Sequence, residues 1–276
     1  MNQPSARTVR ERVSAGEWDL RVNLAACYRL VARYGMTDLV YNHITARVPG
    51  DDEHVLINLY GILYKEVTAS SLVKIDIDGN VIWKPDTDYG LNVSGYVIHG
   101  AIHRARPDVG CIIHTHTRAG MAVSCMREGL LPLTQTSMRF YNHIGYHDYE
   151  GPAIDKAEQE RLVADLGEHN ALVLRNHGLL TCGPSVPEAF NLIYQLEQSC
   201  RAQVDVMAAG ASMSMPDEET LGLHRQALPA RHTPPLRRPR VAGDAASPRS
   251  GPRQRLAAVR LVASQSALPT HTYQPM

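Results

Sequence analysis

The sequence predicts a layered α/β domain, because segments typical of helices alternate with segments typical of strands along most of the chain. The helical segments carry apolar residues at helical spacing and begin at residues that commonly cap a helix. The strand segments are short and apolar, and turn-forming residues bound them. With 276 residues, the chain can bury a large core without disulfides.

The first half of the chain contains a long helix, two strands and a hairpin turn. The capping box Ser14–Glu17 opens a helix with periodic apolar residues, which ends at Gly35. Strands are expected at Val40–Arg47 and His54–Tyr60, because both runs are rich in apolar and β-branched residues. The pair at positions 78–79, Asp-Gly, is typical of a tight turn between antiparallel strands.

The second half continues the alternation. A helix is expected from about Ser94 to Arg106, where Pro107 stops it because proline lacks the amide that a helix interior needs. The remaining elements follow in chain order: a buried strand at Val109–Thr115, a short helix at Arg118–Met126, a helix from Asp155, short strands at Ala171–Arg175 and Leu179–Thr181, and a long helix from the capping box Ser185–Glu188 to about Gly210.

These elements belong to one domain at residues 12–222, between an N-terminal extension at residues 1–11 and a basic tail at residues 223–276. The tail holds nine arginines, one acidic residue and eight prolines, which gives it a net charge of +8. Its composition offers too little apolar surface to offset the entropy lost on ordering, so we expect it to be mostly disordered. The one ordered segment that the tail sequence allows is a short helix at Arg255–Ser264.

The composition argues against several classes of protein. The net charge is zero, which is atypical of proteins dedicated to nucleic acids or anionic membranes. No run of 18 apolar residues exists, and the first residues lack the apolar stretch of a secretory signal. Five cysteines without a CxxC pair fit reduced thiols. We therefore expect a cytoplasmic protein that binds neither nucleic acid nor membrane.

Histidine is the unusual residue, because ten of the 13 histidines lie between positions 43 and 177. His114 and His116 follow a buried Ile-Ile pair on one strand, and residues two apart on a strand face the same way. Their side chains can converge on one metal ion, or they can be two hydrogen-bonded histidines at the end of a strand. His177 sits in a turn beside Gly178, either as a turn residue or as a third ligand. Three imidazoles are an established set for catalytic zinc.

Three further histidines have open roles. His99 and His103 lie four residues apart, so they share one face of their helix. They are either metal ligands or residues on the surface of the helix. His43 lies on a predicted strand, where it either contacts a substrate or is buried and hydrogen-bonded.

These segments together resemble the class II aldolase/adducin family over about residues 15–210. Within the family, the chain resembles the bacterial "aldolase class 2" branch, which is similar to the adducin head, more closely than the sugar-phosphate aldolases. The resemblance is carried, in collinear order, by Tyr41–Arg47, Leu56–Tyr64, Ala69–Asp76, Arg104–Val109 (Arg-Ala-Arg-Pro-Asp-Val), His114–His116 and Asn176–Leu180 (Asn-His-Gly-Leu-Leu).

The resemblance implies a three-layer α/β/α sandwich around a mostly antiparallel central sheet. It also implies one Zn²⁺ per chain, held by His114, His116 and His177, in a homo-oligomer that is a tetramer in the family aldolases, with sites near subunit interfaces. In those aldolases zinc polarises a carbonyl of a small-molecule substrate, and a glutamate removes a proton. Fe²⁺ or Mn²⁺ is an alternative ion, because imidazole suits several metals.

The sequence departs from the family aldolases at the glutamate that acts as the catalytic base and at the residues that bind the phosphate group of the substrate. The position of the glutamate is Gly95, so the base would be a metal-bound hydroxide, His43, His99 or Tyr141. Phosphate cradles need backbone amides and small hydroxyl groups. Here the matching positions are Asn42 and His43, Tyr60 and Gly61, and Val93 and Ser94.

Three functions follow as hypotheses. The first is a zinc-dependent lyase that breaks a carbon–carbon bond in a small oxygenated or carboxylated compound, rather than a classical sugar-phosphate aldolase. The second is an adducin-like, non-catalytic module that binds an actin-like or other cytoskeletal partner. The third is an Fe- or Mn-dependent decarboxylase or oxygenase. Loss of the glutamate favours the second, whereas the three histidines favour the first and third.

Overall fold

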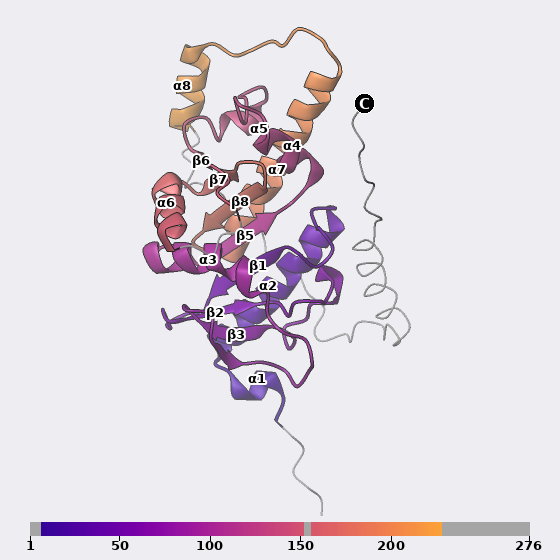
Figure 1. Cartoon of the computed structure of the whole chain (residues 1–276), viewed down its shortest axis with the longest axis vertical. Coiled ribbons are helices and arrows are strands. Elements are labelled where there is room, and N and C mark those ends of the chain that lie inside the picture. Colours follow the sequence, from indigo (N-terminus) through magenta and orange to yellow (C-terminus); the bar gives the residue numbers. More distant parts are fainter. Residues whose placement is uncertain (1–6, 152–155, 228–276) are drawn as a thin grey trace, which may run out of the picture. The chain divides into compact units, whose positions relative to one another are not determined.

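An eight-stranded sheet forms the centre of the structure, and helices cover both of its faces (Figure 1). The structure is a computed structural model that describes residues 7–151 and 156–227, all within the first of the chain's two units, residues 1–238. Its elements are, in order, α1 (Val9–Arg12), α2 (Ala15–Arg33), β1 (His43–Arg47), β2 (His54–Ile57), the 3₁₀ turn η1 (Tyr64–Glu66), β3 (Val73–Asp76), β4 (Val81–Trp83), α3 (Val93–Ala105), β5 (Cys111–Thr115), α4 (Arg118–Ser124), α5 (Gln135–Met138), β6 (Gly145–His147), α6 (Lys156–Leu166), β7 (Ala171–Leu174), β8 (Gly178–Gly183), α7 (Val186–Ala208) and α8 (Glu218–Ala227).

The sheet has the strand order β4-β3-β2-β1-β5-β8-β7-β6. Every neighbouring pair is antiparallel except β6 and β7, which are parallel. The mostly antiparallel sheet expected from the resemblance is therefore confirmed. Two features of the register position the site described below: His43 pairs with His114, and His147 pairs with Leu174.

Alternate residues of the central strands enter separate cores on the two faces of the sheet. Ile113 and Val173 pack into the larger core with residues of α2, α4 and α7. Ile112, Leu172 and Leu174 pack into the opposite core with residues of α3 and α6. A strand buried on both faces reads as an unbroken apolar run, which explains the Ile-Ile and Leu-Val-Leu segments. Helix, sheet and helix therefore form the three layers that the resemblance implies.

Local signals determine several element ends. The Oγ of Ser14 accepts a hydrogen bond from the backbone amide of Glu17 at 3.1 Å, which caps the first turn of α2. Gly35 follows that helix with φ of +67°, a backbone conformation that favours glycine. The sequence misses α1, α5, α8 and β6, which are all short or lack an apolar pattern, and it indicates β3 and β4 only through the turn between them.

The terminal predictions fall largely outside the described residues. Helix α8 continues to Ala227, past the domain boundary expected at residue 222. Residues 1–6 of the extension, the start of the predicted helix at Asp155, and the tail from residue 228, with its predicted helix at Arg255–Ser264, are not described. Among the described residues, none of the helices is both long and apolar enough to span a membrane. All five cysteines are free thiols.

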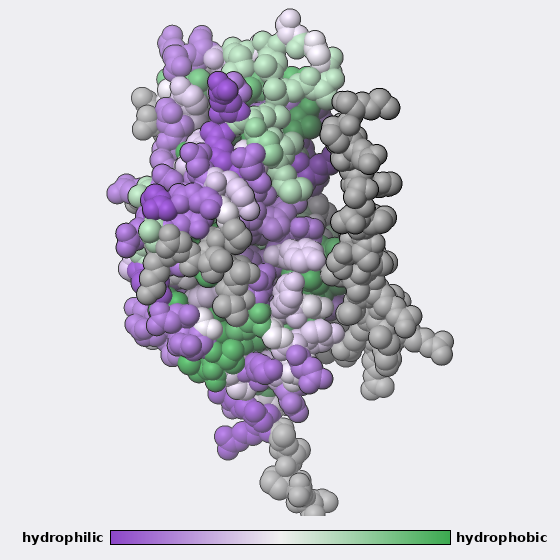
Figure 2. All heavy atoms as spheres, viewed as in Figure 1, coloured by the Kyte–Doolittle hydropathy of each residue, from purple (hydrophilic) through white to green (hydrophobic). Residues whose placement is uncertain are grey.

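Exposed apolar side chains gather where α7 ends and in the segment that leads to α8, seen as pale green at the top of Figure 2. Met207, Met213 and Met215 each expose more than two fifths of their surface, and Val206 lies beside them in the sequence. Several apolar side chains exposed together are less usual than single ones. The described residues therefore leave an apolar surface uncovered here.

Candidate functional site

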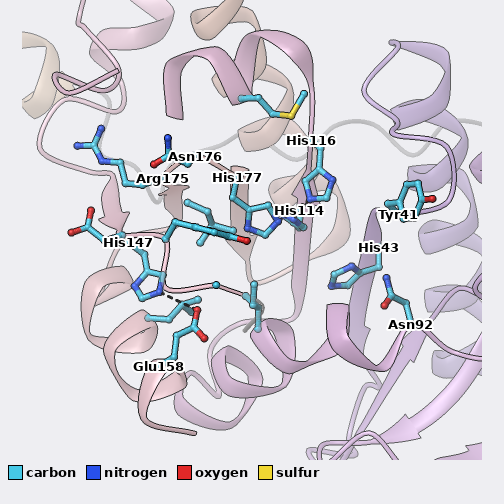
Figure 3. Close-up of a pocket in the computed structure, with 17 residues that line it drawn as sticks. Tyr41, His43, Asn92, His114, His116, His147, Glu158, Arg175, Asn176 and His177 are labelled. Carbon is cyan, nitrogen blue, oxygen red and sulfur yellow. Dashed lines mark hydrogen bonds and ion pairs between the residues drawn. The ribbon is translucent and has the colours of Figure 1, made fainter. Parts of the chain in front are cut away.

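A pocket of about 480 Å³ opens where β5 and β7 end, on the side of the sheet that α3 and α6 cover (Figure 3). Its lining comes from segments that are far apart in the sequence. It includes the three histidines His114, His116 and His177, together with His43, Tyr41 and Asn92 on one side and His147, Glu158 and Arg175 on the other.

His114 is the buried member of the three-histidine set. It occupies β5, and only 3% of its surface is exposed. Its Nδ1 lies 3.0 Å from the carbonyl oxygen of Leu179 on the neighbouring strand. Because a carbonyl only accepts hydrogen bonds, Nδ1 carries the proton. Burial lowers the pKa of His114 well below its usual value, helped by the nearby rings of His116 and His177. The ring is therefore neutral at pH 7, and its Nε2 presents a lone pair.

His116 lies directly after β5 and is oriented by a carboxylate. Its Nδ1 lies 3.1 Å from Oδ2 of Asp38, so the Nδ1 proton points to the carboxylate and Nε2 points to His114 and His177. A carboxylate behind a ligating imidazole fixes the orientation of the ring and increases its basicity. The sequence analysis missed Asp38, because no motif links it to a histidine 78 positions away.

His177 reaches the set from the turn between β7 and β8. Asn176 takes φ of +57° in this turn, a conformation that asparagine tolerates better than most residues. A Cβ at Gly178 would lie 2.4 Å from the carbonyl oxygen of Thr115, so glycine is needed for the turn to approach the end of β5. Burial, followed by the nearby His116 ring, lowers the pKa of His177 to about 4.

The Nε2 atoms of the three rings converge. The Nε2 of His116 lies 2.7 Å from that of His114 and 3.0 Å from that of His177, and the three ligand atoms all lie within 4.8 Å of one another. Lone pairs this close repel unless a positive charge lies among them. A shared proton would bridge two of the nitrogens, whereas a metal ion would bind all three. Tetrahedral zinc, with bonds of about 2.0–2.1 Å, separates its ligand nitrogens by about 3.3 Å. The donor set therefore fits a divalent cation after a small outward movement of the rings.

The other predicted histidines lie behind this set. His43 is 2% exposed and lines the pocket, with its ring centroid 5.9 Å from that of His114 and 4.1 Å from that of His99. Thr45 Oγ1 lies 2.9 Å from Nδ1 of His99 and 2.8 Å from Nε2 of His103. Burial lowers the pKa of His103 to about 3 and that of His99 well below its usual value.

The structure corrects the alternatives stated for the helix pair. His99 and His103 share a face, as predicted, but that face packs against β1, so the pair is neither exposed on the helix nor among the residues that line the pocket. Tyr141, the third candidate base, lies outside the pocket lining too, and its hydroxyl donates to the carboxylate of Glu218 at 3.1–3.2 Å. Of the three side chains considered as the base, His43, His99 and Tyr141, only His43 lines the pocket.

Asn42 and Tyr60, two of the positions that match the family phosphate cradle, do not line the pocket. Asn42 is buried, and its Oδ1 accepts a hydrogen bond from the amide of Asp38. Tyr60 is partly exposed and does not line the pocket. The side chains of residues 93–95 lie outside the described part, although Gly95 falls within α3.

A second polar cluster lines the same pocket, and the sequence analysis missed it. His147 is the last residue of β6, and Glu158 lies in the first turn of α6. Both residues are at most 5% exposed. The Nδ1 of His147 lies 2.8 Å from Oδ2 of Asp165. Its Nε2 lies 3.8 Å from Oε1 of Glu158, and a dashed line joins these two residues in Figure 3. The count of histidines was the only available signal, because β6 has three residues and no apolar pattern.

Comparison with known proteins identifies relatives of the whole domain. Residues 22–204 match the family described as Class II Aldolase and Adducin N-terminal domain. The chain is 50% identical over 205 residues to the "Putative aldolase class 2 protein PA3430" of Pseudomonas aeruginosa, a match that covers 74% of this chain and 78% of that protein. It is 46% identical over 195 residues to alpha-adducin of Rattus norvegicus, which covers 70% of this chain but 26% of that adducin.

Solved structures give the same result. An aldolase II superfamily protein from Pseudomonas syringae superposes with a TM-score of 0.77 and 44% identity, covering 94% of this chain and 98% of that chain. L-fuculose 1-phosphate aldolase from Glaciozyma antarctica superposes with a TM-score of 0.71 and 29% identity, covering 82% of this chain and 86% of that chain. The similarity therefore spans the complete sheet and both helical layers.

Proposed function

The chain belongs to the class II aldolase and adducin family, and from this premise we propose that it is a metal-dependent lyase that breaks a carbon–carbon bond in a small oxygenated or carboxylated compound. The observation that carries the proposal is the convergence of three Nε2 atoms within 4.8 Å at the wall of a pocket. The proposed ligands are His114, His116 and His177.

The metal would supply Lewis acidity, which polarises a substrate carbonyl and stabilises the negative charge that develops on its oxygen. Zinc is the proposed ion because it accepts three imidazoles and keeps a fourth position open, with Fe²⁺ or Mn²⁺ as the alternative. The chain itself orients two of the rings, through the carbonyl of Leu179 and the carboxylate of Asp38. His43 lines the pocket beside His114 and would contact the substrate.

We propose a substrate without a phosphate group. Among the described residues that line the pocket, Arg175 is the one permanent cation. Its guanidinium donates to the backbone carbonyls of Met126 and Arg127 and stacks on Tyr146, with its carbon 4.5 Å from the ring centroid. The lining also carries carboxylates such as Glu158, which would repel a phosphate dianion.

The test is a turnover assay with a panel of small hydroxyketones and 2-oxo or hydroxy carboxylates, each offered with and without a sugar phosphate counterpart. We expect carbon–carbon cleavage of an unphosphorylated compound, lost on treatment with a chelator and restored by Zn²⁺. Turnover that resists complete removal of the metal would contradict the metal-dependent reaction. A strong preference for the phosphorylated counterparts would contradict the substrate class.

A second candidate is a non-catalytic binding module of the adducin type. The identity of 46% with the matching region of alpha-adducin favours it, as does glycine at the position of the family base. The proposed partner is an actin-like or other cytoskeletal protein. Cosedimentation with filaments tests this candidate: tight binding together with complete inactivity on the panel would support the module over the enzyme.

The state and location of the protein follow as lesser proposals. We propose a homo-oligomer, a tetramer as in family aldolases, and sedimentation velocity measures the mass directly. We also propose a cytoplasmic location, because the five cysteines are free thiols, as expected where the environment is reducing. The domain would comprise residues 12–222, and limited proteolysis would leave this core intact.

A further inference from the structure

His147 lies between two carboxylates in the pocket that contains the three-histidine set. Asp165 lies behind the ring, with Oδ2 2.8 Å from Nδ1, and Glu158 lies in front of it, with Oε1 3.8 Å from Nε2. His147 is 4% exposed and Glu158 is 5% exposed, whereas the Asp165 side chain is 42% exposed. Helix α6 provides both carboxylates, and β6 provides the histidine.

The hydrogen bonds determine which ring nitrogen can react. A carboxylate only accepts hydrogen bonds, so the Nδ1–H of His147 donates to Asp165. In the neutral ring, Nε2 then carries a lone pair. It has no hydrogen-bond partner among the described residues, although it is buried. A buried nitrogen without a partner is unfavourable and suggests that a ligand provides the missing donor. The arrangement of ring and carboxylate is the one that lets histidine accept a proton.

The two clusters face one cavity from neighbouring strands. His147 pairs with Leu174 at the end of the parallel β6–β7 pair, and the amide of Arg175 donates to the carbonyl of His147 at 2.8 Å. His177 follows in the turn after β7, and both His147 and His177 line the pocket. Figure 3 shows the two clusters on opposite sides of this space. Both clusters therefore line one cavity of about 480 Å³, a volume that admits a small compound.

We propose that His147 is the proton-transfer residue of this pocket, in place of the family glutamate, whose position is Gly95 in this chain. Asp165 is its positioning residue, and Glu158 provides the charge that stabilises the protonated ring. This inference rests on the proposed function. The Nε2 of His147 accepts a proton from the carbon next to the substrate carbonyl. The electron pair of the broken C–H bond forms the enolate, whose negative charge lies on the carbonyl oxygen. In the reverse step, the ring returns the proton to carbon.

The two carboxylates lower the cost of that step. Once Nε2 is protonated, the ring is a cation, and nearby negative charges attract it. Asp165 lies 2.8 Å from one ring nitrogen and Glu158 lies 3.8 Å from the other. Replacement of Glu158 by glutamine keeps the shape and removes one of the two charges, so it should slow the transfer less than removal of the ring does.

The experiment measures exchange of carbon-bound hydrogen in D₂O by ¹H NMR, with the full-length zinc-loaded protein and three probes: hydroxyacetone, dihydroxyacetone and pyruvate. Each has hydrogen on a carbon next to a carbonyl. We expect the wild-type protein to exchange at least one probe. His147→Ala should slow that exchange by about 100-fold or more, the size of effect general base catalysis usually has. Added imidazole should restore part of the rate, because it can occupy the space of the deleted ring.

The matched control is His54→Ala, which removes another histidine paired with an aspartate. His54 Nδ1 lies 2.7 Å from Oδ2 of Asp51 near the surface, and it does not line the pocket. This variant should exchange at the wild-type rate. Zinc content and the circular dichroism spectrum of each variant establish that the fold and the metal site are intact.

Each outcome separates the inference from the proposed function. Wild-type exchange that persists in His147→Ala overturns the role of His147 and leaves the lyase proposal standing. A loss that imidazole does not rescue, or that accompanies loss of zinc, marks the ring as structural and also overturns the role. If the zinc-loaded wild type exchanges none of the three probes, the proposed function fails and this inference fails with it.

Discussion

The carboxylate of Asp38 should contribute to metal affinity without touching the metal. Its Oδ2 lies 3.1 Å from Nδ1 of His116, the ring that contacts both other members of the three-histidine set. Asp38→Asn removes the negative charge and keeps the shape. Loss of such an outer partner typically weakens metal binding by 10–100-fold. Because the Asp38 side chain is 41% exposed, water screens its charge, so we expect the lower end: about tenfold, or about 1.4 kcal/mol.

The assay is competition for Zn²⁺ between the purified protein and a coloured chelator, which gives the dissociation constant of each variant. Asp88→Asn is the control, because Asp88 is an exposed carboxylate that does not line the pocket. We expect the control to bind Zn²⁺ like the wild type. If Asp38→Asn also bound Zn²⁺ with wild-type affinity, the orientation of His116 by Asp38 would be irrelevant to the site, and the reasoning would be wrong.

Three further predictions concern packing, protonation and thiol reactivity. Gly178→Ala should lower the unfolding free energy by about 1–3 kcal/mol, because the new Cβ would lie 2.4 Å from the backbone oxygen of Thr115. Gly90→Ala is the control in the denaturation experiment, because open space surrounds Gly90. Equal losses of unfolding free energy in the two variants would contradict the predicted steric clash at Gly178. Burial lowers the pKa of His103 to about 3 from 6.5, so between these values the unfolded chain binds a proton that the folded chain does not. His103 alone should therefore lower the unfolding free energy by about 1.4 kcal/mol per pH unit as the pH falls from 6 to 4, and His99, His114 and His177, whose pKa values burial also lowers, should make the total slope steeper. Urea titrations that find a flat dependence would contradict this. Iodoacetamide should label Cys125 alone in the native protein, because the other four cysteines are buried, and peptide mass spectrometry that finds a second labelled thiol would refute this.

Local signals in the sequence predict much of the fold. The cap at Ser14 and the stop at Gly35 bound α2 within two residues, because both act through neighbouring backbone groups. Alternation along β5 correctly places His114 and His116 on one face, since side chains two apart on a strand always share a face. For these features, the cause lies within a few residues of its effect.

The remainder of the site depends on contacts between distant segments. The pairing of His116 with Asp38 spans 78 positions, and His147 pairs with Asp165 across two elements. The sequence shows that His99 and His103 share a helix face, but only the position of Thr45 on β1 shows that this face is buried. The residues alone left His177 as either a turn residue or a third ligand, because strand geometry places only neighbouring histidines, and the family resemblance implied its convergence with the other two rings.

The metal content of the purified protein tests the central proposal most directly. Elemental analysis of the wild type, His114→Ala and His177→Ala should find about one divalent ion per chain in the wild type and little in either variant, because two remaining imidazoles make an inadequate site. His54→Ala, which removes a histidine outside the pocket, should retain the full content. Wild-type metal content in both His114→Ala and His177→Ala would contradict the three-histidine centre and the lyase proposal that depends on it.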